Sequence, residues 1–187
     1  MSAKLNRRQL AGVGLGLAAA SALPVPVQAA PRLRRIPLED RAEIIDLFAR
    51  YVWAYDCGDE QDFLGLFTND AVVIGKGTAY RDRAAILGWF RHLIEMRDKE
   101  GDDTWMHEAG QFRFMPAGRS WVVHAYATHF NGNTAKAMRG VRSLGYFTCE
   151  CVRANGEWKF RRFSISAWDR TRVPWKKPLP WADLPPI

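Results

Sequence analysis

Asp56 is the residue whose position most strongly indicates chemistry. It follows a segment, residues 44–55, in which apolar side chains recur at three- and four-residue steps and form one face of an amphipathic helix. A carboxylate at the end of a buried helical face costs free energy unless it has a partner or a function. Asp56 is therefore a candidate catalytic residue. Capping the next helix or pairing with an arginine would also explain it.

Histidines supply further candidates, because their charge changes near neutral pH. His124 and His129 lie five residues apart on a predicted strand, so their side chains point to opposite faces. His129 shares its face with Ala125 and Ala127, whose small side chains leave room for a ligand. We therefore place His129 in a pocket. We expect His124 at a subunit interface or in solvent, and His92 on the exposed side of a helix.

The elements that must position Asp56 are helical. Pro37 is suited to the start of the first helix, and Gly58 can take the positive φ that ends it. Beyond it the sequence predicts a short second helix that includes Phe67, a strand at 71–74, a third helix from Asp82 and a charged loop at 95–103.

From Thr104 onwards the pattern changes to strands. They are predicted at 104–115, 120–130, about 144–153 and 158–168, and Asn155-Gly156 is a strong hairpin signal between the last two. This order predicts an α+β domain, a cone-shaped α+β barrel in which three N-terminal helices pack on a strongly curved, mostly antiparallel sheet. Such a sheet and its helices leave a pocket for a small molecule between them.

The two ends of the chain differ from this body. Residues 1–30 combine Arg7-Arg8 with a short apolar, glycine-rich run and a small-residue cleavage pattern, and we interpret them as a twin-arginine-type export signal. We expect a periplasmic or secreted protein, with a linker at 31–37 and the folded domain at 38–168. Residues 169–187 form a proline-rich C-terminal arm, which we expect to lie over an apolar surface.

Composition excludes several classes of protein. Residues 36–168 hold 17 basic and 18 acidic side chains, so the body lacks the basic stripe of a nucleic-acid-binding protein. The three cysteines are too few for a disulfide framework, although Cys57 could pair with Cys149 or Cys151. No spacing of cysteine or histidine indicates a metal site, and we expect no cofactor. The apolar run near the N-terminus is too short to cross a bilayer, so we expect no stable membrane insertion of the mature chain.

The chain resembles the SnoaL-like branch of the nuclear transport factor 2-like superfamily over about residues 38–168. The resemblance depends on the order of several segments: Ile44-Ile45-Asp46-Leu47, Tyr55-Asp56-x-Gly58-Asp59, Phe67-Thr68-Asn69-Asp70-Ala71, His107, Gly145-Tyr146 and residues 152–159. Members of this superfamily include dehydratases, isomerases, cyclases and proteins without catalysis, so the fold alone does not decide the function.

The resemblance implies a catalytic pair. In scytalone dehydratase-like and dehydrochlorinase-like members an aspartate ends the first helix and a histidine lies about fifty residues later on a facing strand, as Asp56 and His107 do here. In an elimination, the histidine would take and return a proton while the aspartate fixes its tautomer. Tyr51 and Tyr55 are the candidates for holding an oxyanion or protonating the leaving group. Bile-acid dehydratases of the superfamily have a tyrosine at the position of Tyr51.

These residues predict a cofactor-independent dehydratase acting on a hydrophobic, hydroxylated ring such as a steroid or a polyketide-like compound. Besides His129, the pocket is expected to include Tyr80, Phe67, Trp89 and Arg142. Two alternatives remain open: an isomerase or cyclase in which Asp56 itself moves the proton, and a periplasmic binding protein without catalysis. We expect a homo-oligomer, either a dimer or a trimer, because exposed aromatic residues on the outer sheet face favour self-association.

Overall fold

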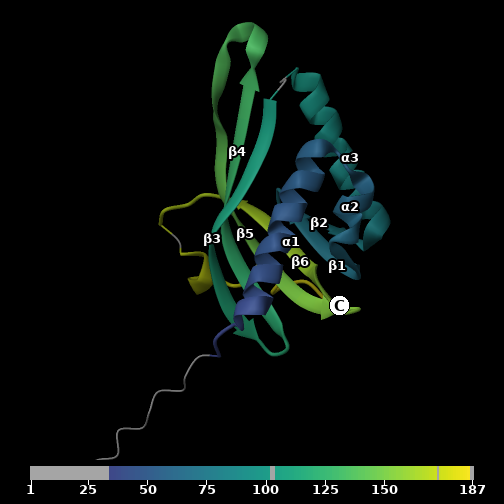
Figure 1. Ribbon diagram of the computed structural model, residues 1–187, viewed down its shortest axis with the longest axis vertical. Helices are drawn as coiled ribbons and strands as arrows, with labels where there is room; N and C mark the ends of the chain where they lie inside the picture. The colour runs from purple at the N-terminus through teal and green to yellow at the C-terminus, as the bar shows by residue number, and fades with distance from the viewer. Residues whose placement is uncertain (1–33, 102–103, 172, 186–187) are drawn as a thin grey trace, which may run out of the picture. The chain divides into compact units, whose positions relative to one another are not determined.

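The computed structural model describes residues 34–101, 104–171 and 173–185 (Figure 1). The predicted export signal and the first residues of the linker lie outside the described residues. The described residues form one compact unit. Its elements in chain order are α1 (Leu38–Cys57), α2 (Glu60–Gly65), β1 (Phe67–Gly75), β2 (Thr78–Arg81), α3 (Asp82–Glu100), β3 (Thr104–Ala117), β4 (Ser120–Asn133), β5 (Met138–Ala154) and β6 (Glu157–Ala167), with 3-10 turns at Thr134–Lys136 and Pro174–Lys176.

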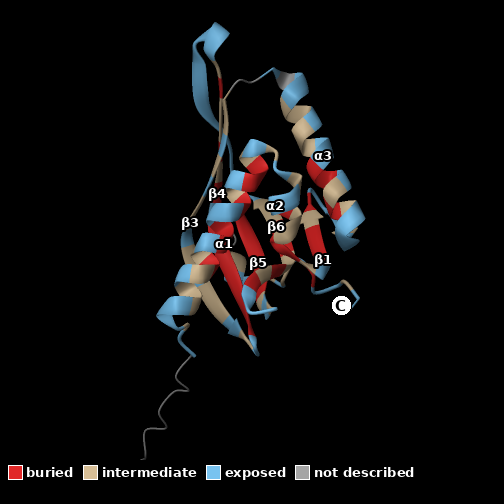
Figure 2. Cartoon of the chain, turned by 45° about the vertical axis from the view of Figure 1, so that its right-hand side comes forward, coloured by how far each residue is buried: buried red, intermediate tan, exposed pale blue. Residues whose placement is uncertain are grey.

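The six strands form one sheet in the order β2-β1-β6-β5-β4-β3. All neighbouring pairs are antiparallel except β1 and β6, which are parallel. The three helices pack on one face of this sheet, where the buried residues are concentrated (Figure 2). The predicted α+β class, with helices on a curved and mostly antiparallel sheet, is confirmed.

The first helix begins and ends where the sequence predicts. Pro37 is its N-cap, and Gly58 follows Cys57 with a φ of 74°. In that left-handed conformation the Gly58 N–H reaches the carbonyls of Ala54 and Tyr55, which an ordinary residue would do only with strain. Asp59 then caps α2 by accepting a hydrogen bond from the Asp62 N–H at 2.9 Å.

Two predictions for the middle of the chain are wrong. The segment predicted as a charged loop continues α3 to Glu100, because Met96 and Arg97 keep its inner face half-buried. The predictions also missed β2, which pairs with β1 at the edge of the sheet. Its side chains are mostly exposed, so no alternation of apolar and polar residues marks it as a strand.

Strand boundaries also differ from those predicted. Phe67 is the first residue of β1 rather than part of the second helix. β4 continues to Asn133 instead of ending at 130, and β5 begins at Met138 instead of about Leu144. The extra residues form a long β4–β5 hairpin (Figure 1). Main-chain pairing continues there although the side chains of residues 138–144 on β5 are exposed, and burial patterns do not report such pairing.

Aromatic side chains fill the space between helices and sheet. Phe48 packs edge-on against Phe160 with ring centroids 5.0 Å apart, and Tyr51 lies 4.6 Å from Phe163. Phe63 joins them from α2. The deep interior between the helices and the sheet is therefore a packed aromatic core.

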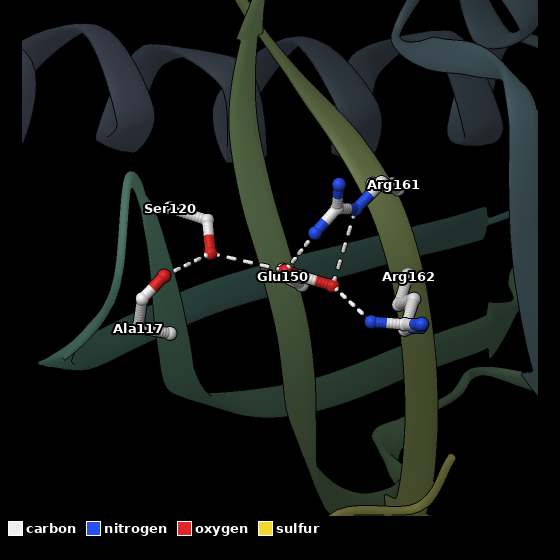
Figure 3. A network of polar contacts seen from close by, with 5 residues as sticks. All are labelled: Ala117, Ser120, Glu150, Arg161 and Arg162. Atoms are coloured by element: carbon white, nitrogen blue, oxygen red, sulfur yellow. Dashed lines mark hydrogen bonds and ion pairs between the residues drawn. The ribbon is translucent and has the colours of Figure 1, made fainter. Parts of the chain in front are cut away.

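The opposite face of the sheet carries a buried polar network centred on Glu150 (Figure 3). Its carboxylate binds Arg161, accepts a hydrogen bond from Arg162 at 2.6 Å and accepts another from the Ser120 hydroxyl at 3.0 Å. The β5–β6 register shifts between Glu150 and Cys151, which leaves Arg161 as an extra residue. This bulge allows two consecutive arginines to reach one carboxylate.

The C-terminal arm lies over this outer face, where the surface beneath it combines aromatic side chains with His124 and Arg113. Trp175 stacks under the Arg113 guanidinium at 4.2 Å, and Lys177 Nζ lies 3.3 Å from the Tyr146 hydroxyl. His124 is buried below the arm with 4 % of its surface exposed, so the expected place at a subunit interface or in solvent is wrong. Cation–π contacts, which suit a polar sheet face, hold the arm.

The remaining expectations concern surface features. His92 is exposed on α3, as predicted. Cys57 is exposed, Cys149 and Cys151 are buried, and all three are free thiols. No helix within the described ranges is long and apolar enough to span a membrane. Exposed aromatic residues, including Tyr126 and Trp168, do occur on the outer sheet face, and the homo-oligomer stays a prediction.

Candidate active site

Asp56 lies in the last turn of α1, where the helix meets β3. Its backbone carbonyl accepts a hydrogen bond from Arg97 of α3 at 3.1 Å, which fixes this end of the helix. The side chain extends past the helix end towards His107, which lies in β3. The helix terminus thus delivers a carboxylate to the sheet.

Asp56 and His107 make two contacts at once. Asp56 Oδ2 accepts a hydrogen bond from the backbone N–H of His107 at 2.7 Å, and Oδ1 lies 2.6 Å from its Nδ1. Their side chains are 13 % and 10 % exposed, respectively. With the carboxylate on Nδ1, the ring proton is held there and Nε2 is left as the basic nitrogen.

A second histidine stacks on the first. His107 and His129 face each other across β3 and β4, with ring centroids 4.3 Å apart and planes 20° from parallel. Trp105 packs edge-on against His129 at 4.1 Å. These contacts hold both imidazoles in one orientation.

The two predicted tyrosines occupy different depths. The Tyr55 ring lies 4.7 Å from the His107 ring, whereas Tyr51 lies one helical turn away, stacked on Tyr55 at 6.0 Å within the aromatic core. Burial raises the pKa of Tyr55, and the Asp56 carboxylate raises it further. Burial likewise raises the pKa of Tyr51. Both phenols therefore remain protonated at neutral pH, and Tyr55 is the one in contact with the histidine.

A cavity of about 320 Å³ opens beside the two histidines. His107 and His129 line it together with Lys76 from the β1–β2 turn. Its remaining walls are small or apolar residues of β4, β5 and β6: Ala127, Thr128, Ser143, Leu144, Gly145, Ile165, Ser166 and Ala167. The cavity is thus a largely apolar space with imidazole at one side and a cation at its rim.

The other predicted pocket residues do not line this cavity. Phe67 is buried in the aromatic core, and Trp89 packs against Tyr80 with ring centroids 5.8 Å apart. Arg142 is exposed at the register shift of the β4–β5 hairpin. Of the pocket candidates, the structure brings only His129 together with His107, and a substrate-binding role for the others stays a prediction.

Sequence reasoning did not place Lys76 or Gly145 at the cavity, although Gly145-Tyr146 is one of the segments of the family resemblance. Lys76 belongs to Gly75-Lys76-Gly77, which the sequence marks only as a break in the chain. Gly145 lies so close to β6 that a Cβ would fall 2.4 Å from the Ser166 carbonyl oxygen. A lysine between two glycines was a usable signal for a side chain at a turn. Nothing local marks Gly145, because its constraint comes from a strand that follows it in the chain.

The sequence profile of the SnoaL-like domain matches residues 37–164. The chain belongs to the SnoaL-like family. No curated protein matches it in sequence. The SnoaL-like fold is consistent with small-molecule binding and with chemistry of the dehydratase, cyclase or isomerase type. Which of these applies depends on the residues of the site.

Solved structures similar to this SnoaL-like chain show the same fold at low identity. ActVI-ORFA from Streptomyces coelicolor is 16 % identical with a TM-score of 0.64, over 70 % of this chain and 96 % of its own. Aln2 from a Streptomyces species is 20 % identical with a TM-score of 0.63, over 72 % and 94 %. A protein from Novosphingobium aromaticivorans, provisionally named a scytalone dehydratase, is 16 % identical with a TM-score of 0.58, over 71 % and 86 %.

Proposed function

We propose that this protein is a lyase that dehydrates a hydrophobic, hydroxylated ring compound without a cofactor, with His107 as the base and Asp56 as its orienting partner. The observation that carries the proposal is the double contact between Asp56 and His107. This contact couples the Asp56 carboxylate to the His107 imidazole, which lines the cavity. A base held in one tautomer beside an apolar space is what proton abstraction from carbon requires.

The proposed reaction is an elimination from a β-hydroxy carbonyl compound. His107 Nε2 takes the proton next to the carbonyl, the C=C bond forms, and the C–O bond to the hydroxyl group breaks. The imidazolium, stabilised by Asp56, returns that proton to the leaving oxygen, which departs as water. The histidine ends in its starting state, so atoms and charge balance without an external reagent.

The cavity supports a compact substrate. A volume of about 320 Å³ is at the lower end of the roughly 300–1,000 Å³ common for ligand pockets. We therefore favour a one- or two-ring compound of polyketide type over a steroid. Lys76 at the rim is placed to interact with the enolate oxygen that develops during proton abstraction. The protonated Tyr55 phenol packs against the ring of His107, with ring centroids 4.7 Å apart.

The same geometry argues against the isomerase in which Asp56 moves the proton itself. Both carboxylate oxygens are already engaged by His107, and Asp56 does not line the cavity. A binding protein without catalysis would not need the paired carboxylate and imidazole. We propose that the reaction takes place outside the cytoplasm, in keeping with the export signal predicted at residues 1–30.

The test uses the chain from Pro31 onwards, with no added cofactor, and a panel of cyclic β-hydroxy ketones and hydroxylated steroids. Mass spectrometry would record loss of one water, about 18 mass units, from the compound that is converted. The variants are Asp56→Asn and His107→Ala, with His92→Ala on the exposed side of α3 as the matched control.

Loss of water that disappears in both site variants and persists in His92→Ala would support the lyase. Double-bond migration at unchanged mass, retained in His107→Ala, would favour the Asp56-based isomerase instead. Saturable binding of a ring compound that is never converted and is indifferent to both substitutions would contradict the lyase and leave a binding protein.

A further inference from the structure

A second cavity lies on the other face of the sheet, beneath the C-terminal arm. Its volume is about 170 Å³, and one side of it is formed by Trp168, just before the arm, and Trp175 of the arm. His124 and Arg113 contribute from the sheet. In Figure 1 the arm, in yellow, runs along the sheet on the side away from the helices. This space is separate from the His107 cavity, because His107 and His129 belong to the opposite face.

His124 provides a buried polar atom at this cavity. Its side chain is 4 % exposed, and its Nδ1 lies 3.1 Å from the Thr148 hydroxyl. Its Nε2 is buried and has no hydrogen-bond partner among the described residues. An unpaired buried nitrogen costs free energy that a bound ligand would recover. Burial and the nearby Arg113 charge lower the pKa of His124 to about 4, so the ring is neutral at physiological pH.

The neutral ring can donate into the cavity. When Nδ1 accepts a hydrogen bond from the Thr148 hydroxyl, the ring proton is on Nε2, which can then donate to an acceptor oxygen. Arg113, directly opposite His124 in the β3–β4 register, adds a guanidinium at the same wall. Its position on the outer face depends on a bulge at Gln111, which has a φ of 52° and shifts the register between Gly110 and Arg113.

The lining is positive on balance and aromatic. The lining residues include two arginines, Arg113 and Arg170, and one carboxylate, Asp169, whose Oδ1 accepts two hydrogen bonds from Thr171. The Tyr126 and Trp168 rings meet edge to face at 5.1 Å, and Trp175 lies under Arg113 at 4.2 Å. Donors at the floor and rings at the wall are complementary to a planar anion.

We propose that this outer cavity is a binding site for a small aromatic carboxylate. The carboxylate oxygens would accept hydrogen bonds from His124 Nε2 and the Arg113 guanidinium, and the ring would pack against Trp168 and Trp175. The volume of about 170 Å³ limits the ligand to a single ring. The site does not depend on the proposed lyase activity, since it shares none of its residues.

The test is a calorimetric titration of the full chain with sodium benzoate, and with benzyl alcohol as the uncharged comparison. The variants His124→Leu and Arg113→Met remove the two donors. His124→Gln restores an N–H near the position of Nε2, and His92→Leu is the exposed control. His107→Ala reports whether benzoate enters the inner cavity instead.

We expect benzoate to bind one-to-one and benzyl alcohol to bind more weakly. His124→Leu and Arg113→Met should each raise the benzoate Kd at least about tenfold, because each removes a hydrogen bond to a charged group. His124→Gln, His92→Leu and His107→Ala should stay near the wild-type value. If His124→Leu does not fold, the comparison of Arg113→Met with wild type decides. Absence of saturable binding, binding lost only in His107→Ala, or binding unchanged in Arg113→Met would overturn the proposal.

Discussion

The Asp56 carboxylate contacts both the main chain and the imidazole ring of His107. Oδ2 accepts the backbone N–H at 2.7 Å while Oδ1 lies 2.6 Å from Nδ1. The first contact fixes the carboxylate relative to β3, and the second fixes the imidazole relative to the carboxylate. The basic Nε2 is thereby positioned at the cavity by two independent constraints.

Replacing Asp56 with asparagine should separate chemistry from folding. The amide oxygen can still accept the His107 N–H, but the amide nitrogen would donate to Nδ1 and move the ring proton to Nε2, which then cannot act as a base. We expect kcat for the dehydration to fall by about 10²–10⁴-fold with little change in Tm. Single-turnover mass spectrometry and thermal unfolding measure the two effects. A variant with unaltered kcat would contradict the role of Asp56.

Gly145→Ala should destabilise the fold next to the inner cavity. The new Cβ would fall 2.4 Å from the Ser166 carbonyl oxygen, so the β5–β6 pair must separate locally. We expect a loss of about 1–3 kcal/mol in the free energy of unfolding, measured by urea titration. Gly140→Ala is the matched control on the same strand, since nothing lies within 4 Å of its Cβ position. Equal stability of the two variants would show that the close approach is not present.

Glu150→Gln should lower stability by leaving two arginines without their charged partner. Arg161 and Arg162 are 36 % and 20 % exposed, so water compensates in part, and we expect a loss of about 2–4 kcal/mol in the free energy of unfolding. Glu157→Gln, at an exposed ion pair with Lys159, should change it by less than about 0.5 kcal/mol. Urea unfolding at pH 7 compares the two variants, and a Glu150→Gln effect as small as the control's would contradict the prediction.

The Glu150 network also predicts an acid limit to stability. Burial acts to raise the pKa of Glu150, but hydrogen bonds from Arg161, Ser120 and Arg162 outweigh it, and the native pKa is lowered. A lowered carboxylate pKa stabilises the fold above the unfolded pKa, about 4.3, and this contribution is lost as the pH falls through the native pKa. In Glu150→Gln the free energy of unfolding, measured by urea titration, should depend less on pH below about 4.3 than in the wild-type protein.

His124 predicts a pH effect in a different window. Its native pKa is lowered to about 4, whereas an unfolded histidine titrates near 6.5. Between these values the unfolded chain binds more protons, so stability falls as the pH is lowered from about 6.5 to 4. His124→Gln should reduce this slope in urea titrations, and the exposed His92→Gln should not. An unchanged slope in His124→Gln would show that His124 does not titrate in this way.

The sequence located Asp56 and the helix that presents it because helical periodicity and a closing glycine are local signals. His129 was placed on the pocket face for a similar reason, since strand side chains alternate. The pairing of Asp56 with His107 came from the family resemblance, because residues 51 positions apart carry no local sign of contact. Lys76 and Gly145 were missed, as their roles depend on strands elsewhere in the chain.

By itself the sequence determined the α+β class, the first helix with its cap at Gly58, and the hairpin at Asn155-Gly156, because these depend on periodicity and on backbone preferences of neighbouring residues. Only the tertiary structure decided that aromatic rings fill the deep interior and that the cavity lies beside His107 and His129. It also decided that the C-terminal arm covers polar residues such as His124. The volume of the cavity, the register shifts between strands and the coverage of His124 by the arm arise from contacts between distant segments. No local sequence pattern encodes them.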